Sequence, residues 1–229
     1  MDRHREFWNR EYQTSEHLAL SSAPAEDLQK FVRFLERQTK HEILNPRSKV
    51  LDLGCGNGRN LIYLAEEFGM RGTGYDISHV AIQEAERASK DLPIQYEVRS
   101  IVEPLPQPDE SVNVVMDMMT SHFLKKAERE ALKAEILRVL RTTGWFFFKS
   151  FLAEEDLNVK RLLRDHPADE ENSYIHPELG VYEHVWTEDE LHEFFEPYFE
   201  IHKVHKSHKH LKRGRAGKRR TISAYLQKL

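Results

Sequence analysis

The sequence predicts an α/β domain in which helices cover both faces of a doubly wound parallel sheet. Between residues 49 and 151, short apolar runs typical of strands alternate with amphipathic stretches typical of helices. One of these runs, 49–53, leads into a turn with glycine at positions 54, 56 and 58, and a helical pattern follows directly. The length of 229 residues fits one such domain with a sizeable core.

The expected elements follow from hydrophobic periodicity and from the residues that begin or end helices. Two helices are expected first, at 3–13 and 25–40, separated by a turn at 21–24. The alternating part is expected to comprise strand 49–53, helix 58–68, strand 71–76, helix 78–90, strand 94–99, strand 112–117, helix 124–140 and strand 144–151. A capping box, Thr187-x-x-Glu190, begins a helix at 187–196, and strands are expected near 198–206 and 219–227.

The turn at Gly54, Gly56 and Gly58 is the most specific motif of the chain. Glycine lets the backbone approach a ligand closely, and the first N–H groups of the following helix have no partner within that helix. A dinucleotide fingerprint, Gly-x-Gly-x-x-Gly, would place its third glycine at position 59, where this sequence has Arg59. The spacing therefore favours a nucleotide-like cofactor that is not bound through a pyrophosphate.

The segment that contains this turn is the first of several that follow one another along the chain. They are 51–58, 72–78, 105–111, 112–117 and 137–145. Over residues 48–150, this set resembles the motifs of the class I S-adenosylmethionine-dependent methyltransferases. The resemblance implies a Rossmann-like, seven-stranded sheet with a final antiparallel strand. It also implies S-adenosylmethionine as the cofactor and S-adenosylhomocysteine as its product.

The resemblance further implies which residues surround the cofactor. In this family an acidic residue at the end of the second strand, here Asp76, binds both ribose hydroxyls, and the two oxygens of a carboxylate suit that task. Where the family usually places an acidic residue for the adenine amino group, this sequence has Ser100, with Ile101 expected to pack on the ring. The motif residues expected at the cofactor are Asp52, Gly54, Cys55, Gly56, Asn57, Gly58, Asn60, Asp76, Ile77, Ser100, Ile101, Asp117 and Met118.

Two aromatic residues near the start of the chain are further candidates for the cofactor site. Trp8 and Tyr12 resemble a Trp-x-x-x-Tyr element at the front of many family members, where the aromatic rings close over the methionine end of the cofactor. A second interpretation is that these residues, four apart, form the buried face of an amphipathic helix. The two interpretations are compatible.

The segment that follows the fourth core strand, 117–123, offers candidates for catalysis. His122 has a side chain that titrates near neutrality and could take a proton from an acceptor hydroxyl or amine, and Asp117 is a second candidate. Alternatively, His122 only flanks the next helix. Transfer from a sulfonium requires mainly alignment and exclusion of water, so no base is obligatory. No metal is expected, because no His-x-x-x-His or carboxylate cluster of ligand spacing occurs here.

Residues 152–186 exceed what a minimal core of this kind needs. The segment is long, shows no strong periodicity and is rich in aromatic residues, which argues against disorder. In a doubly wound fold it would emerge at the carboxyl ends of the strands, where ligands bind. We expect a lid over the acceptor site, and the alternative is an insertion that covers the edge of the sheet.

The C-terminal part of the chain differs in charge from the rest. Residues 201–229 contain ten Lys/Arg and no Asp/Glu, although the net charge of the whole chain is −4. One interpretation is a grip on RNA or another anionic partner. The other is a hairpin loop that is solvated or paired with the acidic body. The basic residues concerned are Lys212, Arg213, Arg215, Lys218, Arg219 and Arg220.

The chain is expected to form one domain in four parts. These are an N-terminal helical cap (1–47), a cofactor-binding core (48–151), the lid (152–186), and a final helix with a basic strand hairpin (187–229). No apolar run approaches the roughly 18 residues of a membrane span, and the N-terminus lacks the apolar stretch of a signal peptide, so a cytoplasmic protein is expected. The oligomeric state is not predicted.

The leading functional hypothesis is methyl transfer to a small molecule held under the lid. A second hypothesis keeps this chemistry but makes RNA or protein the acceptor, docked on the basic hairpin. A third is a non-catalytic module that binds S-adenosylmethionine, and an NAD-dependent oxidoreductase is a more distant alternative.

Overall fold

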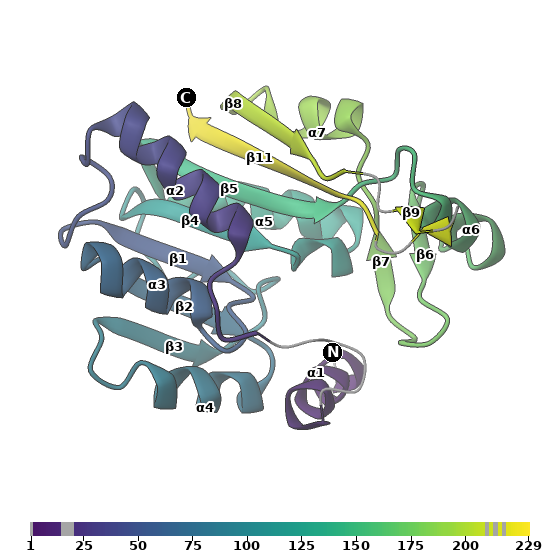
Figure 1. Ribbon diagram of the computed structural model, residues 1–229, viewed down its shortest axis with the longest axis horizontal. Helices are drawn as coiled ribbons and strands as arrows, with labels where there is room; N and C mark the ends of the chain where they lie inside the picture. The colour runs from purple at the N-terminus through teal and green to yellow at the C-terminus, as the bar shows by residue number, and fades with distance from the viewer. Residues whose placement is uncertain (1, 15–20, 209–210, 213–214, 217–218) are drawn as a thin grey trace.

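The structure is a computed structural model that describes residues 2–14, 21–208, 211–212, 215–216 and 219–229. Within these residues, one sheet has seven strands in the order β3-β2-β1-β4-β5-β11-β8 (Figure 1). Its parallel part comprises β3 (Ile94–Val98), β2 (Arg71–Asp76), β1 (Lys49–Leu53), β4 (Val112–Met118) and β5 (Leu140–Phe151). The last strand, β11 (Thr221–Lys228), runs antiparallel to both β5 and β8 (Phe199–Lys206). The predicted fold class, including its reversed final strand, is confirmed.

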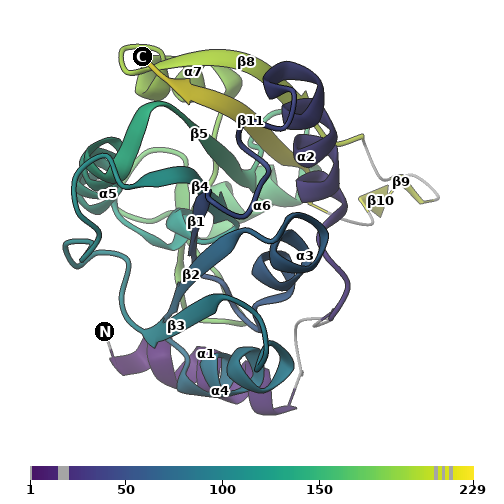
Figure 2. The same cartoon turned by 90° about the vertical axis from the view of Figure 1, so that its left-hand side faces the viewer.

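Helices cover both faces of the sheet (Figures 1 and 2). One face carries α2 (Glu26–Thr39), α3 (Arg59–Phe68) and α4 (His79–Ala88), and the other carries α5 (Lys126–Val139) and α7 (Glu188–Phe195). Successive side chains of β5 show why residues 145–148 are apolar on both faces of this strand. Trp145 and Phe147 pack in the core on the α2 side, whereas Phe146 and Phe148 pack on the α5 side, because side chains alternate along a strand.

The element bounds agree with the expected ranges to within a few residues, and two boundaries are informative. Strand β5 begins at Leu140, earlier than expected, because Leu140 pairs with Val112 across a shift in register. Helix α7 begins at the predicted cap, where the Thr187 hydroxyl accepts a hydrogen bond from the Glu190 N–H at 3.0 Å. The first helix, α1 (Asp2–Thr14), packs beside α4 (Figure 2).

The segment 152–186 has secondary structure that its sequence did not predict. It contains α6 (Leu157–Asp165) and an antiparallel pair, β6 (Ser173–Ile175) and β7 (Tyr182–His184). Backbone hydrogen bonds from Trp186 to Phe151 and from Ala153 to Trp186 close the base of this segment. The insertion therefore projects from the carboxyl end of β5 (Figure 1).

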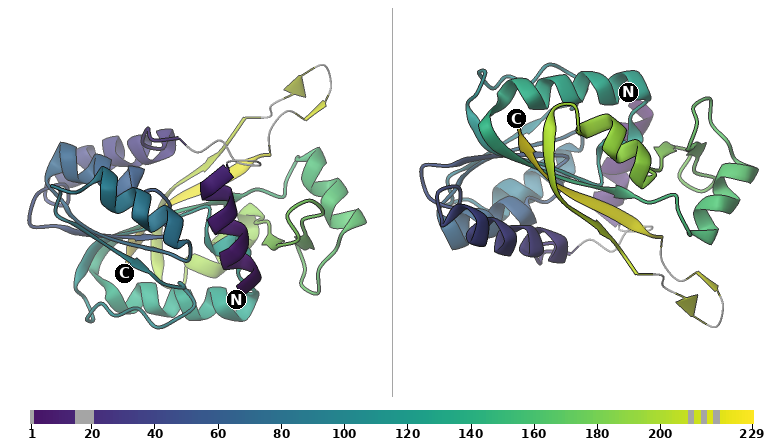
Figure 3. Two further views of the ribbon diagram at one scale, coloured as in Figure 1. Left: turned by 90° about the horizontal axis from the view of Figure 1, so that it is seen from below. Right: turned by 90° about the horizontal axis from the view of Figure 1, so that it is seen from above.

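A further pair of very short strands lies beyond β8 and β11. β9 (Leu211–Lys212) and β10 (Arg215–Ala216) are antiparallel and project away from the sheet (Figure 3). The side chains of Lys212, Arg213, Arg215 and Lys218 lie outside the described residues, so the predicted grip of these four on an anionic partner stays a prediction. Among the residues that are described, no helix is long and apolar enough to cross a membrane.

Candidate active site

The turn after β1 has a backbone that requires glycine. Gly54 and Gly56 have φ angles of +77° and +54°. A Cβ atom on Gly54 would lie 2.1 Å from the Thr120 side chain, and one on Gly56 would lie 2.2 Å from the Tyr12 hydroxyl. The turn can therefore hold this conformation, with these two neighbours packed against it, only because both positions lack a side chain.

The carboxylate of Asp76 lies beside this turn, because β2 runs parallel to β1 and ends at the same edge of the sheet. One oxygen accepts a hydrogen bond from the Gly56 N–H at 2.9 Å, and the other accepts one from the Ser78 N–H at 2.8 Å. Burial raises the pKa of this carboxyl above its usual value, whereas the backbone N–H groups oppose that shift. Each oxygen keeps a further lone pair, so Asp76 can accept more hydrogen bonds from a ligand.

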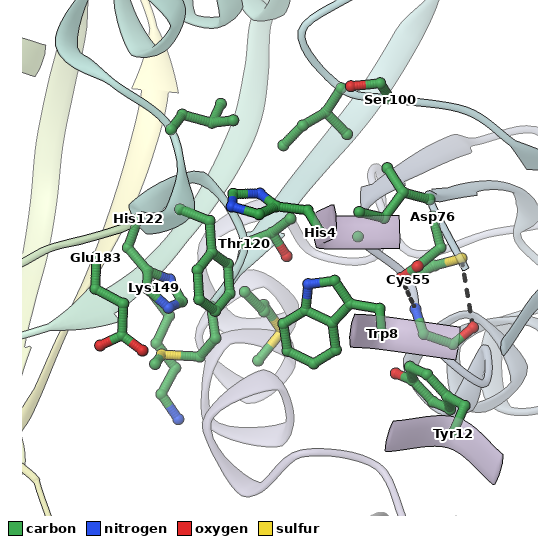
Figure 4. Close-up of a pocket in the computed structure, with 18 of the residues that line it drawn as sticks. His4, Trp8, Tyr12, Cys55, Asp76, Ser100, Thr120, His122, Lys149 and Glu183 are labelled. Carbon is green, nitrogen blue, oxygen red and sulfur yellow. Dashed lines mark hydrogen bonds between the residues drawn. The ribbon is translucent and has the colours of Figure 1, made fainter. Parts of the chain in front are cut away.

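The N-terminal helix forms a second wall next to the turn. Trp8 and Tyr12 of α1 line the same cavity as Asp76, and the Trp8 ring lies edge-on to Phe123, with ring centroids 5.3 Å apart. The Ser78 hydroxyl donates a hydrogen bond to Asn9 of α1 at 2.9 Å. Trp8 and Tyr12 are half-buried and face the cavity (Figure 4), whereas the residues of α1 that are buried against the domain are Phe7 and Glu11.

A cavity of about 740 Å³ extends from the glycine turn to the insertion. Asp76, Cys55 and Tyr12 lie toward one end in Figure 4, Trp8 and Thr120 lie near the middle, and His122 and Glu183 lie toward the other end. Its volume falls in the range of small-molecule sites. The carboxyl ends of β1, β2, β4 and β5 meet here, which is where ligands bind in doubly wound folds.

The loop after β4 is held in a constrained shape at the centre of the cavity wall. Met119 has a φ of +68°, which is unfavourable for a residue with a side chain. The Asp117 carboxylate fixes this loop by accepting hydrogen bonds from the N–H groups of Thr120 and Ser121 at 3.3 and 3.1 Å. Burial raises the pKa of Asp117 to about 6. Asp117 thus shapes the loop that presents Thr120 and His122 to the cavity.

His122 belongs to a short 3-10 helix, η1 (Ser121–Phe123), and its side chain is buried among aromatic rings. Its ring centroid lies 4.0 Å from that of Phe123 and 5.1 Å from that of Phe151. Within the described part of the chain, neither ring nitrogen has a hydrogen-bond partner. Burial lowers the pKa of His122 to about 3, so the ring is neutral at pH 7 and has a free lone pair.

A buried ion pair closes the end of the cavity beside His122. Arg219 donates a hydrogen bond to Glu183 at 2.6 Å, and the Tyr174 hydroxyl donates to the same carboxylate oxygen. The Arg219 guanidinium holds the pKa of Glu183 below its usual value, although burial acts in the opposite direction. At the same end Lys149 pairs with Asp27 of α2 at 2.6 Å. Most of the charges at this end are thus paired within the protein.

Comparison with known proteins agrees with this geometry. A family model described as a methyltransferase domain matches residues 50–144. The solved structure of an S-adenosylmethionine-dependent methyltransferase from Methanosarcina mazei is 27% identical, covers 83% of this chain and 97% of its own, and superposes with a TM-score of 0.69. Residues 50–144 therefore form a class I S-adenosylmethionine-dependent methyltransferase domain. The predicted family and its cofactor, S-adenosylmethionine, are confirmed at this level.

Two further relatives of this family member are named for different activities. A fatty-acid O-methyltransferase of Mycolicibacterium smegmatis is 25% identical over 163 residues, which are 70% of this chain and 58% of that enzyme. A 1,6-didemethyltoxoflavin-N1-methyltransferase of Burkholderia thailandensis, solved with S-adenosylhomocysteine bound, has a TM-score of 0.68 at 17% identity and covers 99% of this chain and 88% of its own. The chain spans between 19% and 58% of the length of the first three curated relatives that it matches.

Most of the predicted site residues of this family member line the one cavity. They are Trp8, Tyr12, Gly54, Cys55, Gly56, Asn57, Asn60, Asp76, Ile77, Ser100, Ile101, Met118 and His122. Three others lie behind its wall. Asp52 is fully buried under the turn, Asp117 is bonded to the loop after β4, and Gly58 precedes α3 with its hydrogen atoms toward Tyr96. Contact of these residues with the cofactor stays a prediction.

Sequence reasoning missed several residues of the cavity wall. Those with polar or aromatic side chains include His4, Arg99, Thr120, Lys149, Phe151, Glu183 and Arg219. The long insertion was the only sequence signal for Glu183. For Arg219 the only signal was the basic tail, for which a solvated hairpin, one paired with the acidic body, or a grip on an anionic partner had been expected. The next residue, Arg220, is also held by the protein, because its guanidinium donates to the carbonyl oxygens of Ser207 and Glu154.

No metal centre emerges from the described residues, which contain no group of three or more His, Cys, Asp or Glu that could hold a metal ion. The lone cysteine, Cys55, is buried beneath the turn, and burial raises the pKa of its thiol well above the usual value. The thiol is therefore poorly suited to act as a nucleophile.

Proposed function

We propose that this chain transfers a methyl group from S-adenosylmethionine to a small-molecule acceptor bound in the same cavity. The observation that carries the proposal is the continuity of the cavity, which connects Asp76 and the glycine turn with His122 and Glu183. A cavity that is roofed by α1 and the insertion suits a ligand of limited size better than a polymer.

The residues at the Asp76 end fit the cofactor. The Asp76 oxygens retain lone pairs for two vicinal ribose hydroxyls, and we expect Ser100 and Ile101, which line the same cavity, to contact the adenine ring. Trp8 and Tyr12 would cover the methionine part. When bound, the cofactor supplies a sulfonium methyl group, whose transfer to a nucleophile needs no further activation.

The chain itself must align the acceptor and exclude water. Thr120, Trp8 and Phe123 surround the middle of the cavity, and the insertion residues His176, Leu179 and Glu183 complete the wall beyond. We propose that neutral His122 accepts a hydrogen bond from the O–H or N–H group of the acceptor and thereby points the nucleophilic lone pair toward the methyl group.

We propose a separate role for each of three of the expected parts of the domain. Residues 48–151 would bind the cofactor, α1 in the N-terminal part would cover it, and the insertion 152–186 would act as the lid over the acceptor. The insertion supports this role because four of its residues face the cavity: His176, Glu178, Leu179 and Glu183. The two relatives described above, whose names specify a fatty acid and 1,6-didemethyltoxoflavin, give further support to a small-molecule acceptor.

The test is transfer of tritiated methyl from S-adenosylmethionine into the metabolite, RNA and protein fractions of a cell lysate, with calorimetric titration of S-adenosylhomocysteine in parallel. We expect binding in the titration and label in the metabolite fraction. Label confined to RNA or protein would contradict the small-molecule acceptor and favour docking on the basic hairpin. Binding without label in any fraction would favour a non-catalytic module.

A further inference from the structure

The face of α1 that lines the cavity carries three residues at intervals of four, His4, Trp8 and Tyr12. Residues four apart lie on one side of a helix, and Figure 4 shows all three side chains projecting to the same side of α1. Tyr12 lies beside Gly56 of the glycine turn. His4 is about 12 Å further along the helix axis, at a rise of 1.5 Å per residue. His4 therefore reaches a part of the cavity away from the glycine turn.

The imidazole of His4 is not held by the protein. Within the described part of the chain, neither ring nitrogen has a hydrogen-bond partner, and the residue is only half-buried, so a ligand or water can reach it. Burial and, to a smaller extent, the positive charge at the start of the chain lower the pKa of His4 below its usual value of 6.5. Glu128 of α5, the charged group that faces it from another element, raises the pKa but does not cancel this shift. At pH 7 the ring is therefore mainly neutral and keeps one basic lone pair.

His122, the histidine that the sequence indicated for catalysis, differs from His4 in its basicity. Its pKa of about 3 allows it to accept a hydrogen bond, but a group with such a pKa does not keep a proton at neutral pH. The pKa of His4 is lowered much less, and its half-exposed ring can pass a proton on to water. Of these two cavity histidines, His4 is therefore the better base.

On the basis of the proposed function, we propose that His4 is the general base of the methyl transfer and takes the proton that the O–H or N–H nucleophile of the acceptor loses. A bond forms between the nucleophile and the methyl carbon, while the bond from that carbon to sulfur breaks and its electron pair stays on the sulfur. The proton passes to the unprotonated ring nitrogen of His4, and the resulting imidazolium releases it to solvent. The products are the methylated acceptor, S-adenosylhomocysteine and one proton.

The first test is the pH dependence of transfer with saturating S-adenosylmethionine and the metabolite fraction of a lysate as the source of acceptor. At low acceptor concentration, the initial rate of labelling is proportional to kcat/KM. We expect this rate to fall as the pH drops through a value below 6.5, because a protonated ring cannot take a further proton. His4→Gln should be about 10²-fold slower at pH 7.5 and lack this fall, whereas His122→Phe should keep it. His79→Gln, at an exposed position of α4, is the matched control and should change neither the rate nor its pH dependence.

The second test returns a base to a protein that lacks the His4 ring. His4→Ala leaves a space at the cavity wall that free imidazole can enter. We expect imidazole to raise the rate of this variant about tenfold or more. Pyrazole, a ring of the same size that is a far weaker base, should not raise it. A purely structural ring would be replaced equally well by either compound, so the difference between the two reports on proton transfer.

The outcomes separate this proposal from the proposed function. An unchanged rate in His4→Gln, or equal rescue by pyrazole and imidazole, would overturn the role of His4 and leave the proposed function intact. If His4→Ala does not fold, His4→Gln and its pH profile decide. Label confined to RNA or protein would contradict the small-molecule acceptor, and the same variants then test His4 on that fraction. Absence of label from every fraction would contradict the proposed function and the role of His4 together.

Discussion

The carboxylate of Asp76, at the end of β2, accepts a hydrogen bond from the backbone N–H of Gly56, in the turn after β1, at 2.9 Å. This bond joins the two most specific motifs of the sequence into one unit at the cavity wall. A ligand that contacts one of them therefore meets the other in a fixed position.

Replacing Asp76 with Ala should weaken S-adenosylhomocysteine binding by about 2 kcal/mol, or roughly 30-fold, because charge-assisted hydrogen bonds to the ribose are lost. Calorimetric titration measures this change, and circular dichroism checks the fold. Asp91→Ala removes an exposed carboxylate elsewhere and serves as the control. Equal affinity in the two variants would contradict the role of Asp76.

Binding of S-adenosylhomocysteine should also depend on pH through Asp76. Burial raises the pKa of this carboxyl in the free protein, so protonation on acidification begins at a higher pH than for an ordinary aspartate. The ionised form accepts hydrogen bonds, so affinity should fall as the pH drops through this raised pKa. In Asp76→Asn the affinity should be lower throughout and lack this dependence. Titrations between pH 4 and 8 would detect the difference.

Replacing Gly56 with Ala should impair cofactor binding through α1. The added Cβ would sit 2.2 Å from the Tyr12 hydroxyl and on a backbone with a φ of +54°. We expect α1 to shift and S-adenosylhomocysteine affinity to fall about tenfold or more, at a strain of roughly 1 kcal/mol at the turn. Adding Tyr12→Phe removes the clashing oxygen and should recover part of the loss. No recovery in the double variant would show that the turn, and not α1, is responsible.

Asp52 should make the stability of the protein fall as the pH rises. Burial, together with the charges of Asp117 and Asp76, raises the pKa of Asp52 to about 8, well above that of an unfolded aspartate. The folded state thus holds a proton that the unfolded state releases near pH 4. Stability from this group is full below pH 4 and declines, by up to about 1.4 kcal/mol per pH unit, until about pH 8. Urea unfolding should therefore show that Asp52→Asn stabilises the protein more at pH 8 than at pH 5.

Replacing His122 with Phe should lower the rate of methyl transfer by about 10²-fold while S-adenosylhomocysteine affinity stays unchanged. The phenyl ring fills the same aromatic surroundings but cannot accept a hydrogen bond. Because burial lowers the pKa of His122 to about 3, titration of His122 should not affect kcat/KM near pH 6.5 in the unmodified protein. A change of kcat/KM near pH 6.5 that is present in the unmodified protein and absent from the variant would contradict the proposed role. An unchanged rate in the variant would contradict it as well.

The core elements were predictable because their signals are local. The strands at 49–53 and 71–76 have the predicted bounds, and the glycine turn between β1 and α3 lies where its spacing indicated. The insertion was less predictable. β6 and β7 are three residues each and exist through their pairing with one another, which hydrophobic periodicity does not reveal.

Arg219 shows the limit of reasoning from charge along the chain. Its neighbours in sequence are basic, which favoured a hairpin that is solvated, bound to an anionic partner or paired with the acidic body, without indicating which acidic residue would be the partner. In the fold its partners are Glu183 and Phe151, which are distant in sequence. The nature of a charged side chain is fixed by its sequence, but whether that charge is paired, buried or free depends on segments that only tertiary contacts bring together.

By itself, the sequence determined the fold class, the family, the order of the elements and the residues at the Asp76 end of the cavity, since these depend on short motifs whose residues are close in the chain. Only the tertiary structure decided which residues form the opposite end. His122, Glu183 and Arg219 come from three separate segments, and they share one wall because the insertion returns to the sheet beside the start of β11. Their burial, and with it the neutral state of His122, follows from that packing.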